Sequence, residues 1–372
     1  MHLQERINVL VALGKRLNDL DDDRIATAIR RTSNQNSWFT ADNQRLALTE
    51  IRDHFLNKNA LEKWISAYKI RENEQNTEGV VFELKTRNEA SDGTLNAVDS
   101  LQTSNVKRQT IGLVLAGNIP LVGFHDILCV FVAGHKAVVK LSDKDPFLLP
   151  MLLEFLKEID DRAAAYFSTT TERLSGFDAV IATGSNNSAR YFEAYFGKYP
   201  HIIRKNRNAV AILRGSETVD ELRLLGNDIF QYFGLGCRNV SKLYLPKGYN
   251  FTLLLETLHE RNDIVLHDKY KNNFDYNFTL LILNKIKYES NGCVLMRETM
   301  DIASPISVVY YEFYDNLKDL KTTLQAKSEE IQLVVSALPL ENMKTFNFGE
   351  AQKPSLVDYA DGVDTMQFLI EV

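Results

Sequence analysis

The sequence predicts an α/β protein with a doubly wound first domain and a second α/β domain, because apolar segments typical of buried strands alternate with helical segments in two successive sections. The strand patterns of the first section are TIGLVLAG, KAVVKLS and FDAVIATGS, then short strands around HIIR and NAVAIL. The helices expected between them lie in LVGFHDILCVFVAGH, after Asp145 and Pro146, and at about 186–197. Sheets of this kind bind ligands at the carboxyl ends of their strands.

The second section begins with the helical segment TVDELRLLGNDIFQYF. Strands are expected near 240–245, 278–283, 305–311 and 331–336, where short apolar runs are separated by turn-forming residues. This alternation predicts a second α/β domain.

The N-terminal region is expected to be helical and polar-faced to about residue 105, with a loop rich in Asn, Ser and Asp at about 88–105. Thr40 is expected to cap a helix that follows it. The C-terminal segment PSLVDYADGVDTMQFLIEV is apolar enough to dock on the protein. Apolar residues at helical spacing predict an amphipathic packing helix at the start of the chain: Leu3, Ile7, Leu10, Leu13, Leu17 and Leu20.

Composition excludes several classes of protein. Of the 372 residues, 45% are hydrophobic and 25% charged, which is typical of a globular chain and not of a disordered one. The net charge is −6 and the charges are interspersed, so no basic stripe for nucleic acid is present. Polar residues and a proline interrupt the most apolar stretch, 111–134, so we expect no membrane span.

Three cysteines are too few for a disulfide framework in a chain of this length, and their spacing is not that of a zinc site. A reducing cytoplasm is therefore expected. Cys129 and Cys293 lie in apolar runs and are expected to be inert core thiols. Cys237 follows Gly234 and Gly236, with basic residues nearby that favour a thiolate, so the pattern leaves it open between a nucleophile and a buried structural thiol.

Polar residues follow three expected strands of the first section. Gly184 and Ser185 open a helix, where backbone N–H groups suit a phosphate but where a purely structural turn and cap would select the same residues. Asn118 can stabilise an oxyanion through its amide or can be a turn residue before a proline. Lys140 ends a strand, where a basic side chain can meet a ribose or phosphate or remain on the surface.

In this order, GNIPLVG, AGHKAVVKLSDKD, ATGS, NRNAVAIL and FGLGCRNVSKLYLP resemble the aldehyde dehydrogenase superfamily. More narrowly they resemble its acyl-CoA reductase branch, which includes the fatty-acid reductase of bacterial luminescence. The resemblance implies a Rossmann-type cofactor domain at 106–207 and a catalytic domain at 208–345. A helical N-terminal region at 1–105 would pack on the cofactor domain, and 346–372 would be a C-terminal docking segment.

Carried over by position, the resemblance gives Cys237 the role of nucleophile and Asn118 that of side-chain oxyanion donor. It also implies a set of residues that bind a nicotinamide cofactor: Lys140, Ser142, Thr183, Gly184, Ser185 and Asp301. The match of Asp301 is loose. No metal is implied.

One departure from the superfamily affects the expected chemistry. Aldehyde-oxidising members carry a glutamate base in the segment E-L-G-G-K, whereas this chain has RKNRNAV, with Arg204 or Lys205 at about that place. Without the base, hydrolysis of a thioacyl enzyme loses a factor of about 10² to 10⁴. The expected reaction is therefore reduction of an acyl thioester, acyl-CoA or acyl-protein, to an aldehyde through a thioacyl-cysteine.

Two alternatives remain at this stage: a thiol acyl carrier or acyltransferase without hydride transfer, and a nonreactive scaffold on the same fold. NADPH is the cofactor that the resemblance implies, with NADH open because Asp143 would repel a 2′-phosphate and Lys144 would attract it. The resemblance also implies a homo-oligomer and an acyl-protein synthetase or acyl carrier as partner. Acyl chain length is not readable from the sequence.

Overall fold

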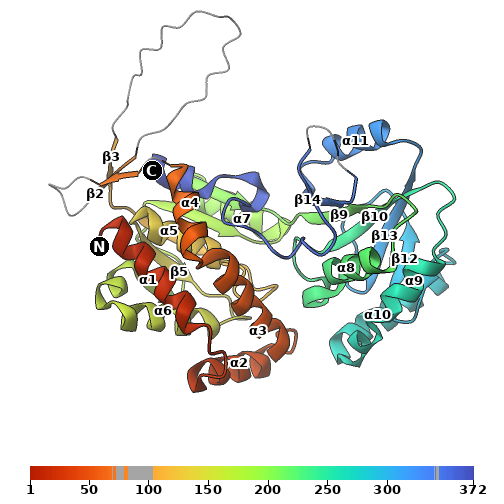
Figure 1. The fold of residues 1–372 in the computed structure, drawn as a ribbon, viewed down its shortest axis with the longest axis horizontal. Helices are drawn as coiled ribbons and strands as arrows, with labels where there is room; N and C mark the ends of the chain where they lie inside the picture. Colours follow the sequence, from red (N-terminus) through yellow and green to blue (C-terminus); the bar gives the residue numbers. More distant parts are fainter. Residues whose placement is uncertain (69, 73–78, 83–103, 339, 341–342) are drawn as a thin grey trace, which may run out of the picture. The chain divides into compact units, whose positions relative to one another are not determined.

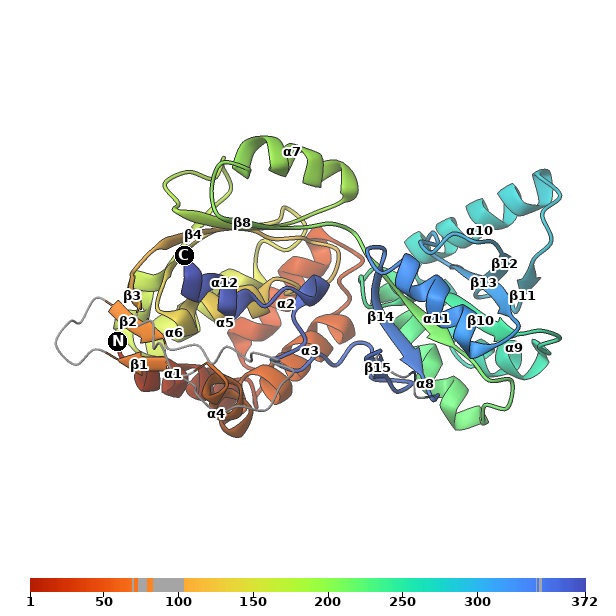
Figure 2. The same ribbon diagram turned by 90° about the horizontal axis from the view of Figure 1, so that it is seen from above.

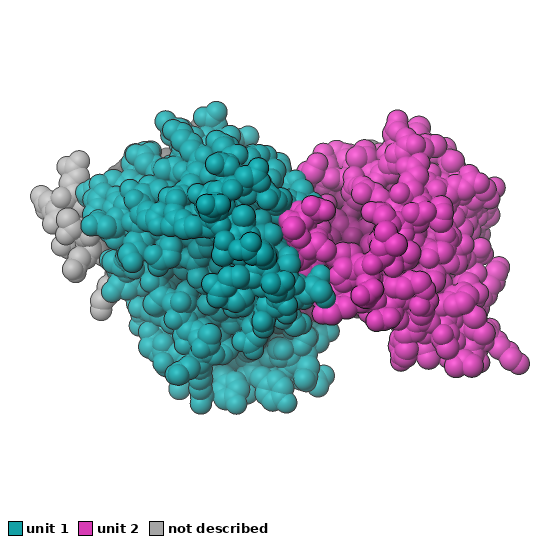
Figure 3. Space-filling model, turned by 90° about the horizontal axis from the view of Figure 1, so that it is seen from below, with its two compact units in different colours: residues 1–37, 44–205, 355–372 teal, residues 38–43, 206–354 magenta. Residues whose placement is uncertain are grey.

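The computed structural model describes residues 1–68, 70–72, 79–82, 104–338, 340 and 343–372. The chain forms two compact units (Figure 3). Unit 1 comprises residues 1–37, 44–205 and 355–372, and unit 2 comprises 38–43 and 206–354. The stretch 346–372, expected as one docking segment, is thus divided between the units.

Unit 1 is built on a five-stranded parallel sheet in the order β6-β5-β4-β7-β8. Its strands are β4 (Thr110–Val114), β5 (Lys136–Lys140), β6 (Phe167–Thr170), β7 (Ala179–Thr183) and β8 (His201–Arg204). The buried strands read as nearly continuous apolar runs, as expected where both faces of a parallel sheet are covered. The doubly wound α/β architecture predicted for this section is confirmed.

Helices cover both faces of this sheet. Helices α5 (Phe124–Ala133) and α6 (Leu148–Ile159) lie on one face, and α7 (Asn186–Phe196) lies on the other (Figure 2). Because side chains alternate along a strand, Ile181 of β7 joins the core under α5 and α6, whereas Val180 joins the cluster that Phe192 and Phe196 of α7 complete.

The N-terminal helices pack on the α5 and α6 side, and α1 lies against α6 (Figure 1). They are α1 (Leu3–Arg16), α2 (Asp23–Gln35), α3 (Ala41–Glu50), the π-helical turn η1 (Ile51–Phe55) and α4 (Lys58–Ser66). The predicted amphipathic helix is confirmed, since Ile7, Leu10 and Leu13 are buried. Thr40 caps α3 as predicted, its Oγ1 accepting the Asn43 N–H at 3.3 Å.

The expectation of helix to residue 105 is wrong for three short segments. β1 (Ile70–Glu72), β2 (Gly79–Phe82) and β3 (Ser104–Lys107) form an antiparallel sheet. The sequence Val80-Val81-Phe82 favours a strand because β-branched and aromatic residues fit an extended backbone. Most of the loop expected at 88–105 lies outside the described residues.

The C-terminal residues dock in unit 1. Helix α12 (Thr365–Glu371) packs on α5 after the short turn η5 (Ala360–Gly362), and Leu369 is fully buried. The Leu369 carbonyl oxygen lies 2.8 Å from His135 Nε2, and Trp64 Nε1 donates to the Tyr359 hydroxyl at 2.7 Å.

Unit 2 is a second α/β layer structure with the strand order β11-β12-β13-β10-β9-β14-β15, parallel except for β11. Its strands are β9 (Asn208–Ile212), β10 (Val240–Pro246), β11 (Glu289–Ser290), β12 (Leu295–Glu298), β13 (Val308–Tyr314), β14 (Ile331–Ser336) and β15 (Thr345–Phe346). Its α-helices are α8 (Val219–Phe230), α9 (Thr252–His259), α10 (Asp268–Leu283) and α11 (Leu317–Ala326). Three 3-10 turns complete the described helices: η2 (Asp161–Tyr166) in unit 1, and η3 (Gln231–Gly234) and η4 (Asn262–Leu266) in unit 2.

The strand predicted at 278–283 is wrong, because these residues form the end of α10. Phe274 and Leu281 of α10 are buried against strands β12 and β13, a spacing that fits a helix. The run Phe278–Leu283 is apolar on the opposite face as well, with Leu280 and Leu283 exposed. A short run that is apolar all round does not distinguish strand from helix by its periodicity.

No helix among the described residues is both long and apolar enough to cross a membrane.

A buried ion pair joins three elements of unit 1. The Arg204 guanidinium at the end of β8 donates to both carboxylate oxygens of Asp126 on α5, at 2.6 and 2.9 Å, and to Thr365 Oγ1 of α12 at 2.9 Å. Arg204 is 3% exposed and Asp126 6%. Removing only one partner of such a pair strongly destabilises the folded protein, because the other charge stays buried without a counter-charge.

We predict that Asp126→Asn lowers the free energy of unfolding by about 3 to 5 kcal/mol, since it leaves the guanidinium buried without its counter-charge. Urea denaturation followed by circular dichroism measures the change. The double variant Asp126→Leu/Arg204→Met removes both charges and should recover most of the loss. Equal stability of Asp126→Asn and wild type would contradict this account.

Candidate functional site

The carboxyl edge of the unit 1 sheet has a point where the chain direction across the sheet reverses. From β4 the chain continues to β5 and β6 on one side, whereas β7 and β8 extend the other side. The connections after β4 and β7 therefore lead to α5 and α7 on opposite faces (Figure 2). In doubly wound sheets, ligands bind beside loops that diverge in this way.

Six of the predicted residues lie at this edge of unit 1. Asn118 lies in the loop after β4, Lys140 ends β5 with Ser142 just beyond it, and Thr183 ends β7 with Gly184 and Ser185 just beyond it. The structure thus brings Asn118 and the predicted cofactor residues of unit 1 to one edge. Cys237 and Asp301 belong to unit 2.

The loops after β4 and β5 approach each other closely. A Cβ atom on Gly117 would lie 2.0 Å from Ser142 Oγ, so only glycine fits there. Ser142 Oγ also accepts the Lys144 N–H at 3.3 Å. Ser142 therefore fixes the relative positions of the loop that carries Asn118 and the loop that follows Lys140.

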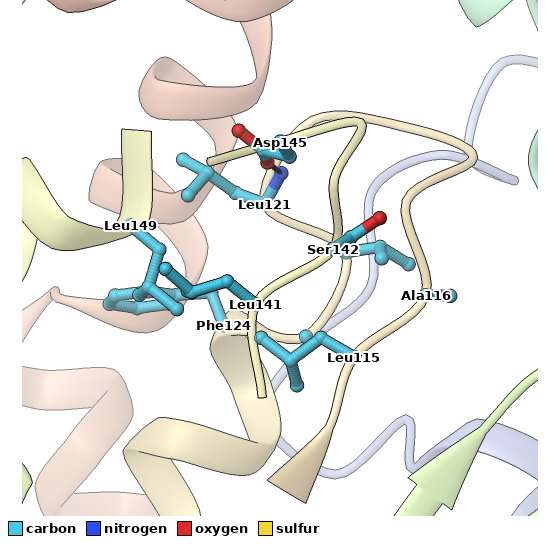
Figure 4. Close-up of a pocket in the computed structure, with 10 residues that line it drawn as sticks. Leu115, Ala116, Leu121, Phe124, Leu141, Ser142, Asp145 and Leu149 are labelled. Atoms are coloured by element: carbon cyan, nitrogen blue, oxygen red, sulfur yellow. Dashed lines mark hydrogen bonds between the residues drawn. The ribbon is translucent and has the colours of Figure 1, made fainter. Parts of the chain in front are cut away.

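Asp145 contributes to the same arrangement, a role that the sequence did not indicate beyond its place before a helix. Its buried carboxylate accepts the N–H of Leu121, a residue with φ of 55°, at 2.9 Å (Figure 4). Burial raises the pKa of Asp145 to about 6. Together with Leu115, Leu141 and neighbouring residues it lines a small, mainly apolar pocket.

Lys140 and Ser185 both make defined contacts. Lys140 Nζ donates to the carbonyl oxygens of Thr171 and Glu172 at 3.1 and 2.9 Å, which ties the end of β5 to the loop after β6. Ser185 caps α7 as predicted, its Oγ accepting the Ser188 N–H at 3.2 Å. A Cβ on Gly184 would lie 2.8 Å from Ser188 and Phe192, so the turn also requires glycine.

In unit 2, Cys237 lies at a corner of a reverse turn just before β10. The Asn239 N–H donates to the Gly236 carbonyl oxygen at 3.0 Å, which closes the turn and leaves Cys237 and Arg238 at its two central positions. The Cys237 side chain is half-buried. A rigid turn at the start of a central strand presents a thiol in one orientation.

The turn is held from inside by the Asn239 side chain, which is 2% exposed. Its Oδ1 accepts the Gly236 N–H at 2.8 Å, and its Nδ2 donates to the carbonyl oxygens of Asp228 and Gln231 at 3.0 and 2.8 Å. Asn239, two residues after Cys237, thus connects Gly236, the residue before Cys237, to the end of α8. The sequence offered one signal for it, a lone Asn between the Gly-Cys-Arg segment and an apolar strand.

The segment between α8 and the turn is strained. Tyr232, Phe233 and Gly234 have φ values of 53°, 59° and 75°, so three successive residues adopt the left-handed conformation and two of them carry side chains. Each non-glycine residue costs about 1 to 2 kcal/mol there. Such strain persists only where the surroundings hold the backbone in place.

Arg238 is held by a backbone segment that a second buried carboxylate fixes in place. Asp228 of α8 accepts the N–H groups of Gly349 and Ala351 at 2.7 and 3.0 Å, and burial raises its pKa to about 6. Arg238 Nε donates to the Ala351 carbonyl oxygen, and its guanidinium lies 5.0 Å from the ring of Phe346. The cation beside Cys237 is therefore fixed to the same helix end as the turn.

Asp301 lies in an exposed loop after β12 whose carbonyl oxygens accept hydrogen bonds from three side chains of unit 2. Lys242 Nζ, fully buried, donates to Thr299 O at 2.9 Å and also to Glu312. Ser241 Oγ donates to Ile302 O at 2.8 Å, and Lys327 Nζ donates to Met300 O. The position of Asp301 is thus well defined, and its role with a cofactor stays a prediction.

The segment RKNRNAV, residues 204–210, contains no acidic residue. Arg204 is engaged in the buried pair with Asp126, and Lys205 is exposed.

The other two cysteines are buried, as predicted. Cys129 and Cys293 are both fully buried, and burial raises the pKa of each thiol, to about 11 for Cys293. None of the three cysteines is in a disulfide. Cys237 is the one with partial access to solvent.

The fold is that of the aldehyde dehydrogenase superfamily. Aldehyde dehydrogenase 21 from Physcomitrella patens superimposes with a TM-score of 0.67 at 14% identity, over 100% of this chain and 84% of that one. An acetylating aldehyde dehydrogenase from Geobacillus thermoglucosidasius superimposes with a TM-score of 0.61 at 11% identity, over 96% and 86%. No family model matches the sequence.

More particularly, the chain resembles a long-chain acyl-protein thioester reductase from Aliivibrio fischeri, with 24% identity over 190 residues, or 46% of this chain. The matched part amounts to 40% of that relative's length. The resemblance that the motifs indicated, to the thioester-reducing branch of the superfamily, is therefore confirmed.

We predict that iodoacetamide alkylates Cys237 at least about tenfold faster than Cys129 or Cys293, because only a thiolate that meets solvent reacts. Mass spectrometry of tryptic peptides from the folded protein measures the three rates. The same experiment in denaturant is the control and should make the rates similar. Preferential labelling of a buried cysteine in the folded protein would contradict the assignment.

Proposed function

We propose that this protein reduces an acyl thioester, acyl-CoA or acyl-protein, to an aldehyde through a thioacyl intermediate on Cys237, with a nicotinamide cofactor. The observation that carries the proposal is the half-buried Cys237 thiol on a rigid turn, in a chain with the aldehyde dehydrogenase fold and a thioester reductase among its relatives.

Cys237 attacks the thioester carbonyl carbon. A bond from its sulfur to the acyl carbon forms, the bond to the carrier sulfur breaks, and the carrier leaves as a thiolate that takes up a proton from water. A thiol needs little help in leaving, so no strong general acid is required. The Asn118 amide and the Cys237 backbone N–H are the proposed donors to the oxyanion, a role worth about 2.7 to 4 kcal/mol per donor in other acyl-transfer enzymes.

The residues at the carboxyl edge of the unit 1 sheet fit a dinucleotide. Gly184 and Gly117 stand where a Cβ would clash, so the backbone there is compact, and Ser185 begins a helix whose N-terminal end favours an anion. Lys140 and Ser142 flank this edge, and Asp301 is a further proposed cofactor-binding residue. When bound, the reduced nicotinamide supplies the hydride that turns the thioacyl group into a thiohemiacetal, whose collapse gives the aldehyde and restores the Cys237 thiol.

The absence of a carboxylate from the segment 204–208 supports reduction over oxidation. A water molecule near the thioacyl group has no base there, so the intermediate lasts long enough to be reduced. The balanced reaction consumes one acyl thioester, one reduced nicotinamide and one proton, and yields one aldehyde, one carrier thiol and one oxidised nicotinamide.

NADPH is the proposed cofactor, with NADH as the alternative that exposed Asp143 and Lys144 leave open. An acyl-protein synthetase or acyl carrier as partner, and a homo-oligomeric state, are proposed on the same resemblance.

Replacing Cys237 by Ser should lower aldehyde formation by about 10³-fold or more, because the acyl acceptor is lost. Wild type and variant are incubated with acyl-CoA of several chain lengths and with NADPH or NADH. Nicotinamide oxidation is followed by absorbance and the aldehyde is trapped as a hydrazone.

The matched control is Cys293→Ala, which removes a buried thiol and should leave the rate within about threefold of wild type. Release of the carrier thiol without nicotinamide oxidation would favour an acyl carrier or acyltransferase. Unchanged aldehyde formation in Cys237→Ser would refute the mechanism.

Lys140→Met should weaken NADPH binding about tenfold, because a charged donor to the ribose is lost. Isothermal titration calorimetry measures the dissociation constant without any thioester. Lys136→Met, at the opposite end of the same strand, is the control and should bind like wild type. Equal affinities of the two variants would remove Lys140 from the site.

A further inference from the structure

An aromatic cluster lies beside the segment that leads to Cys237. The Trp38 ring stacks on His267 with centroids 5.0 Å apart and is tilted against Phe233 at 5.3 Å. The rings of Phe233 and His267 are 4.3 Å apart. We call these three half-buried side chains, all within unit 2, the aromatic clasp.

The start of α10 supports the aromatic clasp. His267 caps α10, its Nδ1 accepting the Tyr270 N–H at 3.4 Å, and the buried Tyr270 ring lies 6.2 Å from that of Phe233. The Tyr270 hydroxyl donates to the Cys293 carbonyl oxygen at 2.9 Å. Phe233 therefore contacts both Trp38 and the start of α10, and Trp38 and His267 also contact each other.

The aromatic clasp includes one residue of the strained segment 232–234. Phe233 is the middle of the three left-handed residues, and Cys237 follows four residues later in a turn that Asn239 closes. Asn239 holds the carbonyl oxygens that precede the strained residues, Asp228 O and Gln231 O, and the N–H that follows them, Gly236 N–H. Between these two anchors, the buried Tyr232 side chain and the Phe233 ring, which contacts Trp38 and His267, both attach the left-handed backbone to unit 2.

We propose that Trp38 is a positioning residue for Cys237: by clamping the Phe233 ring against His267, it keeps residues 232–234 left-handed and so fixes the turn that presents the thiol. A role for this thiol in acyl transfer rests on the proposed function, whereas the positioning itself does not. Trp38 lies almost two hundred residues before Cys237, so nothing near the cysteine in the sequence reveals it.

The first experiment measures backbone hydrogen exchange in the full chain without substrate or nucleotide. Trp38→Ala should speed exchange of the amides of residues 232–238 by at least about tenfold while the strands of unit 2 exchange as in wild type. Trp38→Phe keeps a ring and should stay within about threefold. The control is Trp64→Phe, the other tryptophan, in unit 1, which should leave this segment unchanged. Should Trp38→Ala not fold, Trp38→Leu, which keeps apolar volume without a ring, replaces it.

The second experiment measures the rate of acylation of Cys237 by acyl-CoA in a single turnover without nicotinamide, as release of the carrier thiol. Misplaced reacting groups cost up to about a hundredfold in rate, so Trp38→Ala should slow acylation at least about tenfold for short and long acyl chains alike, with partial rescue by Trp38→Phe.

Unchanged exchange at 232–238 in Trp38→Ala would overturn the positioning role. Slower acylation confined to long acyl chains would likewise overturn it, in favour of a surface that binds the acyl group. Faster exchange in a protein whose wild type forms no aldehyde from any thioester would support the positioning role and refute the proposed function, so the two failures are distinguishable.

Discussion

The conformation around Cys237 depends on the buried side-chain amide of Asn239. This one group accepts a hydrogen bond from Gly236 and donates to carbonyl oxygens at the end of α8, so it closes the turn and attaches it to the helix at once. A buried amide must satisfy its polar atoms, and here it does so with backbone groups that no regular element uses. The turn, the strained residues before it and the start of β10 therefore form one rigid assembly.

Both units use a buried carboxylate to hold a loop. Asp145 in unit 1 accepts the Leu121 N–H, and Asp228 in unit 2 accepts two N–H groups of the segment 349–351. Burial raises both pKa values to about 6, above those of the unfolded chain. The folded protein then binds these protons more tightly than the unfolded chain, so their contribution to stability is full below about pH 4 and is lost as the pH rises to about 6.

Much of the fold could be predicted from the sequence because strand and helix periodicities are local. Apart from β6, which was not predicted, the order of strands and helices from β4 to β9 follows from residues that are neighbours in the chain, as do the caps at Thr40 and Ser185. The prediction failed at 278–283, where apolar residues lie on both faces of a helix, and at β1 to β3, where short strands follow a long helical region. The positions of Asn118, Lys140 and Thr183 at one sheet edge follow from the rule that parallel strands end together. The contacts of Asp228 and Trp38 do not, because each depends on a partner distant in the sequence, and those of Asn239 do not because they depend on an irregular backbone between α8 and β10.

The short segment 38–43 is inserted in unit 2 although the residues on both sides of it, 37 and 44, belong to unit 1. Unit 2 is therefore formed by two separate stretches of the chain, so no single continuous fragment contains unit 2 alone. A fragment of residues 206–354 would contain most of unit 2 but would lack the six residues 38–43, which include Trp38 and Thr40. These residues would have to be supplied as a separate peptide. A chimaera with a related protein would have to exchange residues 38–43 together with residues 206–354 to keep unit 2, which carries Cys237, intact.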